Sequence, residues 1–119
     1  MWLILILLIL DLITKHFLVI VTNTGAAFGI LKGFNISLLV ISLIALIICI
    51  FYYFKDKTLR IPLTFLIAGI LGNSIDRILL GHVRDFINIG IFNFPVFNLA
   101  DSYNVIGVIL LIWMLWKKS

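Results

Sequence analysis

Charge and cysteine are both scarce in this sequence of 119 residues. Only 12% of the residues are charged, whereas 64% are hydrophobic, and the mean hydropathy is +1.29. This composition excludes an ordinary soluble domain and a disordered chain, because both need a larger share of polar residues. The single cysteine, Cys49, cannot form an internal disulfide, and its apolar neighbours predict simple packing. The sequence therefore indicates a membrane protein.

Four apolar stretches are each long enough to cross a bilayer, for which roughly 20 residues are needed. They cover about 1–21, 36–54, 61–80 and 99–116. The first lacks the basic start and small-residue cleavage site of a removable signal peptide, so we interpret it as a retained span. The predicted fold is a single all-α membrane domain over residues 1–119. It is a four-transmembrane-helix bundle with small extracytoplasmic loop or β elements.

Basic residues predict the orientation of this bundle. They gather in the link 55–60 between the second and third stretches and again at 117–118. By the positive-inside rule both places are cytoplasmic, so we expect both termini in the cytoplasm and the segments 22–35 and 81–98 outside. These anchors account for most of the net charge of +4, and we therefore expect no nucleic-acid partner.

Acidic residues are few, and four of the five aspartates lie within or beside the apolar stretches: Asp11, Asp76, Asp85 and Asp101. An ionisable side chain at membrane depth costs about 2.5–3.5 kcal/mol, which favours a functional reason for keeping it. Counting 1.5 Å of rise per residue from the inner ends places Asp76, Asp101 and Lys15 at roughly the same depth in the outer leaflet. The alternative is that each charge pairs or snorkels on its own.

Local spacing refines this layer. Asp11 and Lys15 are four residues apart and can pair on one helix face. Asn98 is a candidate N-cap for the fourth stretch, which places Asp101 in the first helical turn, where the helix dipole favours an ionised carboxylate. Arg77 can pair with one of the carboxylates.

The residue types then limit the chemistry. The serines have no base beside them in sequence, although a Ser102–Lys15 dyad stays open, and His16 and His82 lack metal-ligand spacing. A carboxylate pair remains, in which one group holds a proton and the other activates water for amide hydrolysis. Two alternatives from other classes are a small proton-coupled multidrug transporter using Asp11 and an accessory membrane subunit. The accessory subunit would tolerate neutralised aspartates.

Four blocks of the sequence resemble the bacterial lipoprotein signal peptidase family, also called signal peptidase II. They occur in the family's order, and each falls on a span or loop expected above. The blocks are Asp11-Leu-Ile-Thr-Lys15, Asn23-Thr-Gly-Ala-Ala-Phe28, Gly72-Asn-Ser-Ile-Asp-Arg77 leading to Val83-Arg-Asp-Phe86, and Phe97-Asn-Leu-Ala-Asp101.

This resemblance implies an aspartyl endopeptidase of the bacterial inner membrane with its active site near the outer leaflet. Members remove the signal peptide from prolipoproteins, cutting before a cysteine that carries diacylglycerol. The implied catalytic pair is Asp85 and Asp101, and no cofactor or metal is implied. We expect a monomer whose partners are this substrate and membrane lipid. The implied supporting or substrate-binding residues are Asp11, Lys15, Asn23, Gly25, Asn73, Asp76, Arg77 and Asn98.

The chain also departs from the family pattern. It is shorter than expected, and the stretch between Lys15 and Asn23 is brief, which predicts a reduced outer sheet. Leu12 stands where glutamine is common, and the outer loop 87–97 is compact and has no acidic residue. These differences concern how the substrate is held rather than the carboxylate pair.

Overall fold

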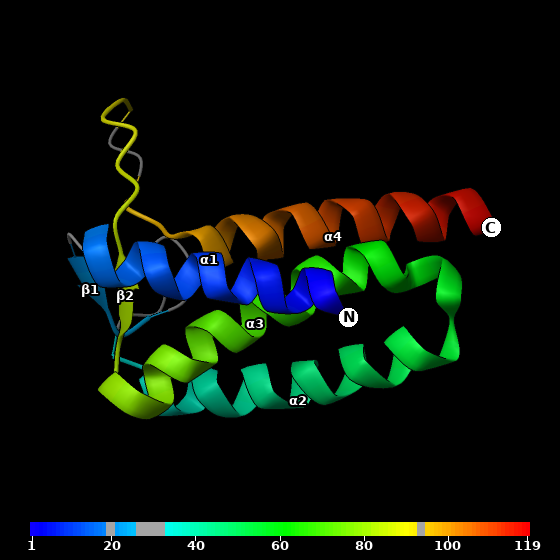
Figure 1. Ribbon diagram of the computed structural model, residues 1–119, viewed down its shortest axis with the longest axis horizontal. Helices are drawn as coiled ribbons and strands as arrows, with labels where there is room; N and C mark the ends of the chain where they lie inside the picture. The colour runs from blue at the N-terminus through cyan, green and yellow to red at the C-terminus, as the bar shows by residue number, and fades with distance from the viewer. Residues whose placement is uncertain (19–20, 26–32, 93–94) are drawn as a thin grey trace.

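The computed structural model describes residues 1–18, 21–25, 33–92 and 95–119, and the side chain of Asn23 also lies outside this description. Long helices make up most of it, and they lie roughly antiparallel with a small sheet at one end (Figure 1). The elements are α1 (Trp2–Leu18), β1 (Val21–Asn23), α2 (Asn35–Lys55), a 3-10 turn η2 (Lys57–Leu59), α3 (Arg60–Leu80), β2 (Val83–Asp85) and α4 (Leu99–Lys118).

Helix α3 is the central element, because α1, α2 and α4 all pack against it. Most of its residues are buried, whereas Tyr53 is the one buried residue of α2. Many of the exposed side chains on α1, α2 and α4 are large and apolar, including Trp2, Ile47 and Trp116. Such a surface suits contact with lipid rather than water. Several charged side chains are buried inside the bundle, among them Asp11, Lys15 and Asp76.

Three helical segments are long and apolar enough to cross a membrane: α2, Lys57–Leu80 and α4. Helix α1 has 17 residues and is shorter than these. The sequence predicted a first span over 1–21, but α1 ends at Leu18 and Val21 already belongs to β1. The difference arises because Val21 pairs with Asp85 in the sheet. A membrane-spanning role for α1 stays a prediction.

Glycine and asparagine residues set the helix ends at the sheet side. Gly81 ends α3 in the left-handed conformation with φ of 76°, and its N–H donates to the carbonyl of Arg77. Gly33 precedes α2 with φ of 90°, and Asn98 caps α4. The cap at Asn98 is the one that the sequence predicted.

Strands β1 and β2 form a two-stranded antiparallel sheet in which Val21 pairs with Asp85 and Asn23 pairs with Val83. In the outer loop 87–97, the described residues show one isolated bridge, between Ile87 and Phe97. The sheet places β2, and with it Asp85, beside the start of α4.

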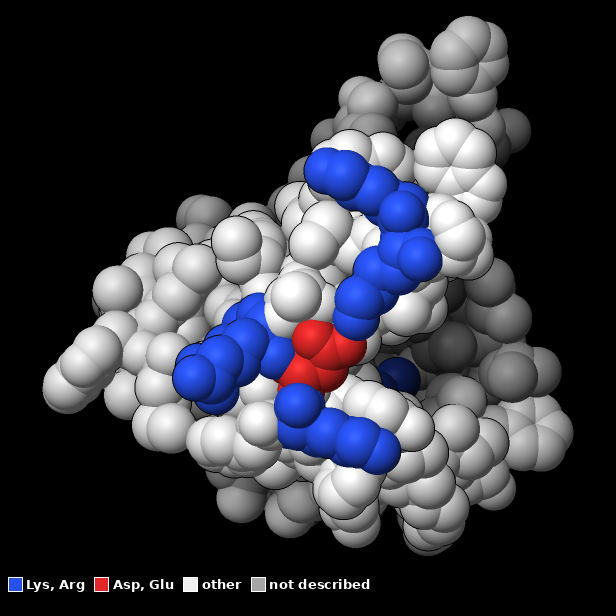
Figure 2. Space-filling model, turned by 90° about the vertical axis from the view of Figure 1, so that its right-hand side faces the viewer, with Lys and Arg blue, Asp and Glu red and all other residues white. Residues whose placement is uncertain are grey.

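The opposite end carries the basic residues, which surround a small acidic patch (Figure 2). Lys118 pairs with Asp56 in the link between α2 and η2 at 2.5 Å. Arg60 donates from Nε to the carbonyl of Tyr53, whose hydroxyl accepts a hydrogen bond from the Met1 amino group at 3.1 Å. These contacts join both termini to the α2–α3 link at one end of the bundle, as the predicted topology requires.

Candidate active site

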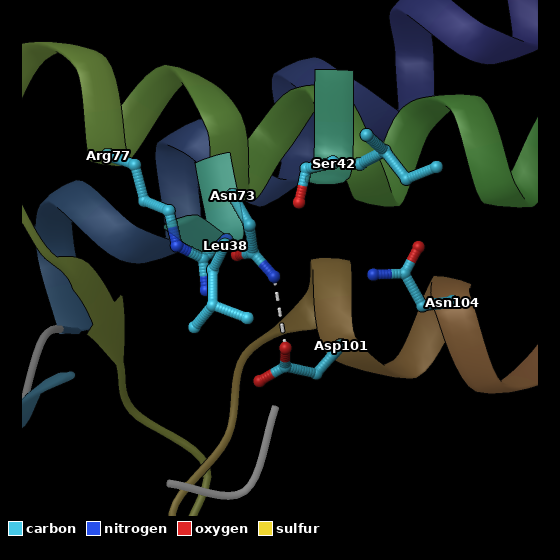
Figure 3. A pocket seen from close by; sticks show the side chains of 7 residues that line it. Leu38, Ser42, Asn73, Arg77, Asp101 and Asn104 are labelled. Atoms are coloured by element: carbon cyan, nitrogen blue, oxygen red, sulfur yellow. Dashed lines mark hydrogen bonds between the residues drawn. The ribbon is translucent and has the colours of Figure 1, made fainter. Parts of the chain in front are cut away.

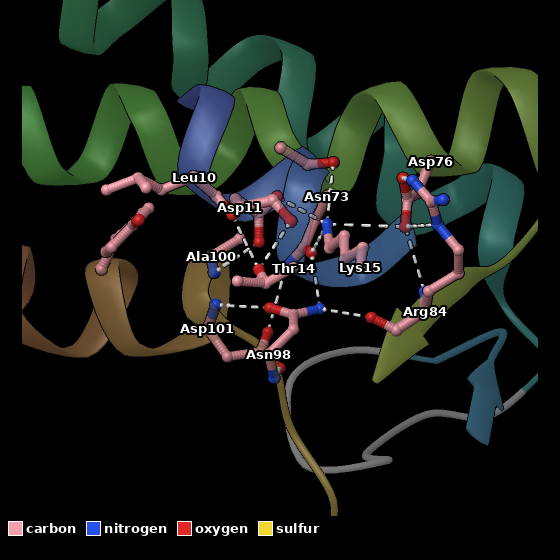
Figure 4. A network of polar contacts seen from close by, with 12 residues as sticks. Leu10, Asp11, Thr14, Lys15, Asn73, Asp76, Arg84, Asn98, Ala100 and Asp101 are labelled. Atoms are coloured by element: carbon pink, nitrogen blue, oxygen red, sulfur yellow. Dashed lines mark hydrogen bonds and ion pairs between the residues drawn. The ribbon is translucent and has the colours of Figure 1, made fainter. Parts of the chain in front are cut away.

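Polar side chains from four elements meet where the bundle adjoins the sheet (Figure 4). Their carboxylates, amides and ammonium group are almost completely buried, and hydrogen bonds and ion pairs connect them into one network. The contributing residues are Asp11 and Lys15 from α1, Asn73 and Asp76 from α3, Asp85 from β2, and Asn98 and Asp101 from the start of α4.

Lys15 is the centre of one half of this network. Its ammonium group lies 2.8 Å from Asp11 Oδ2 and 3.5 Å from Asp76 Oδ2, and it donates to the carbonyl of Gly72 at 3.1 Å. The i,i+4 pair of Asp11 and Lys15 that the sequence predicted is therefore confirmed. Gly72 makes the approach possible, since a Cβ at this position would collide with the Asp11 carboxylate.

Asp76 is held by Arg84 rather than by Arg77. Arg84 Nη2 lies 2.9 Å from Asp76 Oδ1, and both the backbone N–H and Nε of Arg84 donate to Oδ2. From the sequence, Arg77 can pair with one of the carboxylates. In the structure its Nη2 donates to the carbonyl of Gly25 at 2.6 Å, and its charge is also attracted by Asp101, Asp85 and Asp76. We name Asp11, Lys15, Asp76 and Arg84 the ion cluster.

Asn98 and Asn73 form the other half. Asn98 accepts from the N–H of Asp101 through its side-chain oxygen at 2.8 Å, and Asp101 Oδ2 accepts from the N–H of Asn98, which completes a reciprocal helix cap. The Asn98 side-chain nitrogen donates to Asp85 Oδ1 at 2.9 Å and to Asn73 Oδ1 at 3.0 Å. Asn73 in turn donates to Asp101 Oδ1 at 3.0 Å. We name Asn73 and Asn98 the amide bridge.

The amide bridge thus contacts both carboxylates that the sequence analysis singled out. Asp85 and Asp101 are 2% and 1% exposed, and Asn98 hydrogen-bonds each of them. They come from different elements, a strand and a helix start, which are 16 positions apart in the chain (101 minus 85). The side chain of Asn98 donates to Asp85, and its backbone N–H donates to Asp101. Two neighbouring carboxylates can divide one proton between them and act on a water molecule as base and acid.

A cavity of about 160 Å³ adjoins Asp101 between α2, α3 and α4 (Figure 3). Asn73 and Arg77 contribute to its wall from α3, Ser42 from α2, and Asn104 from α4, one turn after Asp101. A substrate chain that entered this cavity would meet Asp101 directly.

Most of the predicted supporting residues therefore lie together. Gly25 is buried and joins the site through Arg77, whereas the side chain of Asn23 lies outside the described part of the chain. Neither Arg84 nor Asn104 was predicted from the sequence, although Arg84 stands beside Asp85 in one of the four blocks. Among the described residues, no group of three His, Cys, Asp or Glu side chains could hold a metal ion.

Comparison with known proteins is consistent with this geometry. A family model described as signal peptidase (SPase) II matches residues 3–117. A lipoprotein signal peptidase from Staphylococcus aureus strain JH9 is 45% identical, over 90% of this chain and 71% of that protein.

Two solved structures, both described as bacterial membrane enzymes, have similar folds. One has a TM-score of 0.87 at 35% identity and covers 98% of this chain and 86% of the other. The second has a TM-score of 0.83 at 36% identity and covers 99% and 92%. These comparisons give no support to the transporter alternative. With a family model matching nearly its whole length and a close curated relative, the chain belongs to the signal peptidase II family.

Proposed function

We propose that Asp85 and Asp101 are the catalytic pair of an aspartic protease that removes signal peptides from prolipoproteins. The family is one of membrane proteases, and this chain has the buried polar site and the apolar exterior that such an enzyme needs. The observation that carries the proposal is the hydrogen bonding of Asn98 to both carboxylates, at 2.9 Å to Asp85 and 3.2 Å to Asp101.

The buried charges support a pair that holds one proton. Four carboxylates and three cations lie in this region. One added proton on a carboxylate therefore brings the net charge of the region to zero. Asp11 and Asp76 are in contact with the cations of the ion cluster, which leaves the proton to the catalytic pair. The carboxylates are Asp11, Asp76, Asp85 and Asp101, and the cations are Lys15, Arg77 and Arg84.

In the proposed mechanism a water molecule lies between the two carboxylates. Asp101 is the base, because it is in the first turn of α4 and accepts hydrogen bonds from Asn73 and from the backbone of Asn98. Asp85 carries the proton, polarises the scissile carbonyl and later protonates the departing amine. The two carboxyl groups titrate as a coupled pair. The roles of base and acid therefore describe one protonation state of the pair.

The substrate and its entry follow from the position of the site. We infer that all four helices, α1 included, cross the bacterial inner membrane as one domain, with both termini in the cytoplasm. The site then lies in the outer leaflet, and a diacylglyceryl-cysteine can keep its acyl chains in lipid while the preceding bond is cut. One chain supplies both carboxylates and the amides that contact them, so the site needs no second subunit, and we infer a monomer.

The test is cleavage of a diacylglyceryl-modified prolipoprotein by purified protein in detergent. Asp85→Asn and Asp101→Asn keep the shape of each side chain, and each should lower kcat by at least about 1,000-fold. Asp56→Asn is the matched control, since Asp56 lies at the opposite end of the bundle, and it should cleave like the wild type. Turnover near the wild-type rate in either site variant excludes the pair. Equal cleavage of unmodified prolipoprotein excludes the requirement for the lipid.

A further inference from the structure

One polar side chain in the cavity beside Asp101 has no role in the mechanism above. Asn104 lies on α4 three residues after Asp101, so it is about 4.5 Å deeper along the helix axis. Its side-chain amide reaches the cavity from the α4 side (Figure 3).

The surroundings of Asn104 do not satisfy its hydrogen-bonding groups. Its oxygen is buried and has no hydrogen-bond partner among the described residues. This oxygen packs against Gly69 of α3, where a Cβ would collide with it. An unpaired buried amide lowers stability, whereas an apolar side chain of similar size would fill the same space without that loss. Packing alone therefore does not explain an asparagine here. Its side-chain nitrogen points into the cavity, where it can donate a hydrogen bond to a ligand (Figure 3).

Resting on the proposed function, we propose that Asn104 binds the main chain of the substrate, at the peptide group one or two residues before the scissile bond. The apolar signal peptide precedes that bond, so it continues from Asp101 deeper into the membrane, past Asn104. An extended chain advances about 3.3 Å per residue, and the 4.5 Å offset corresponds to one or two residues. The side-chain nitrogen that faces the cavity can donate to a main-chain carbonyl, which every substrate offers whatever its side chains.

The test compares two synthetic lipopeptide substrates that differ in this peptide group. One is all-amide, and the other has an ester in place of the peptide bond, which removes the N–H and weakens the carbonyl as an acceptor. For the wild type, kcat/KM should fall about tenfold with the ester. Asn104→Leu should cleave the amide substrate about tenfold less well, mainly through KM, and should lose little more with the ester.

Two controls separate binding from folding. Val105→Leu introduces the same side chain one position along α4, on an exposed surface, and should behave like the wild type with both substrates. Asn104→Ala adds no bulk beside Gly69. It should therefore show the same small effect of the ester on kcat/KM even if Asn104→Leu unfolds. Unfolding temperatures of all variants are measured alongside.

The outcomes are distinct. Loss of the ester effect in both Asn104 variants supports the proposal. An ester effect of the same size in the variants and the wild type overturns it, and so does wild-type cleavage by Asn104→Ala, while both leave the proposed function intact. Failure of the folded wild type to cleave either substrate overturns the proposed function and, with it, this role of Asn104.

Discussion

The carboxylate of Asp11 accepts a hydrogen bond from the backbone N–H of Ala100 at 2.9 Å, although 89 positions separate the two residues. Ala100 is in the first turn of α4, directly before Asp101. The other oxygen of the carboxylate faces Lys15. Helix α1 thus holds the start of α4, and an aspartate that could be taken for a proton carrier has a supporting position instead.

Replacing Asp11 should therefore lower stability as well as activity. Asp11→Ala leaves the Ala100 N–H unpaired and leaves Lys15 with Asp76 at 3.5 Å, so we expect a loss of about 3–5 kcal/mol. Asp11→Asn keeps an oxygen for Ala100 and should lose less. Thermal unfolding in detergent measures the stability of both variants. The reaction of a dye with the single thiol, Cys49, reports the unfolding. Equal unfolding temperatures for Asp11→Ala and the wild type would contradict this role.

Gly72 should be among the least tolerant positions of α3. An added Cβ would collide with the Asp11 carboxylate and lie 3.2 Å from Ala100 Cβ, so Gly72→Ala should displace α1 and cost about 1–3 kcal/mol. Ser74→Ala is the matched control two residues away, because the Ser74 hydroxyl is buried and has no hydrogen-bond partner among the described residues. It should be neutral or stabilising. Thermal unfolding of the two variants is the measurement. An unfolding temperature of Gly72→Ala equal to that of the wild type would contradict the prediction.

Asn98 has two tasks that different substitutions can separate. Serine can still cap a helix, whereas alanine cannot, and loss of a cap costs about 0.5–2 kcal/mol. Either substitution of Asn98 removes the side-chain amide that donates to Asp85 and Asn73. Asn98→Ser should therefore unfold close to the wild-type temperature and still lose at least about tenfold in kcat. Asn98→Ala should lower both the unfolding temperature and kcat. Full activity of Asn98→Ser would show that the amide bridge is dispensable.

The pH dependence of the Asp56–Lys118 contact can be stated with its sign. Hydrogen bonds from Lys118 and then Thr58 lower the pKa of Asp56 from 3.8 to about 2. A lowered pKa in the folded state stabilises above the unfolded pKa, and this contribution is lost as the pH falls towards 2. The difference in unfolding temperature between wild type and Asp56→Asn should be constant above about pH 5, shrink as the pH falls, and vanish below about pH 2. A change between about pH 6 and pH 8 would point to another group.

The sequence predicted those parts of the site that local spacing and depth determine. Four-residue spacing identified the Asp11–Lys15 pair, and cap chemistry identified Asn98 at the start of α4. Counting helical rise from the inner ends placed Asp76 and Asp101 in one layer, and the network that joins them agrees with this.

Other parts depend on contacts that local patterns do not encode. Strands of three residues are too short for an alternating pattern, so the pairing of Val21 with Asp85 could not be predicted. The partner of Asp76 is Arg84 because β2 folds back along α3, and the Arg77 side chain turns towards Gly25. Asn104 looks like an ordinary helix residue until the cavity beside it is known.

The helix cap at Asn98 has a thermodynamic consequence. The same residue ends the outer loop, starts α4 and contacts both carboxylates, so occupancy of the site and formation of the first turn of α4 are linked equilibria. A compound that binds the carboxylates only in their folded arrangement must raise the unfolding temperature by mass action. Inhibitors of this enzyme can therefore be sought by melting curves alone, without a lipidated substrate.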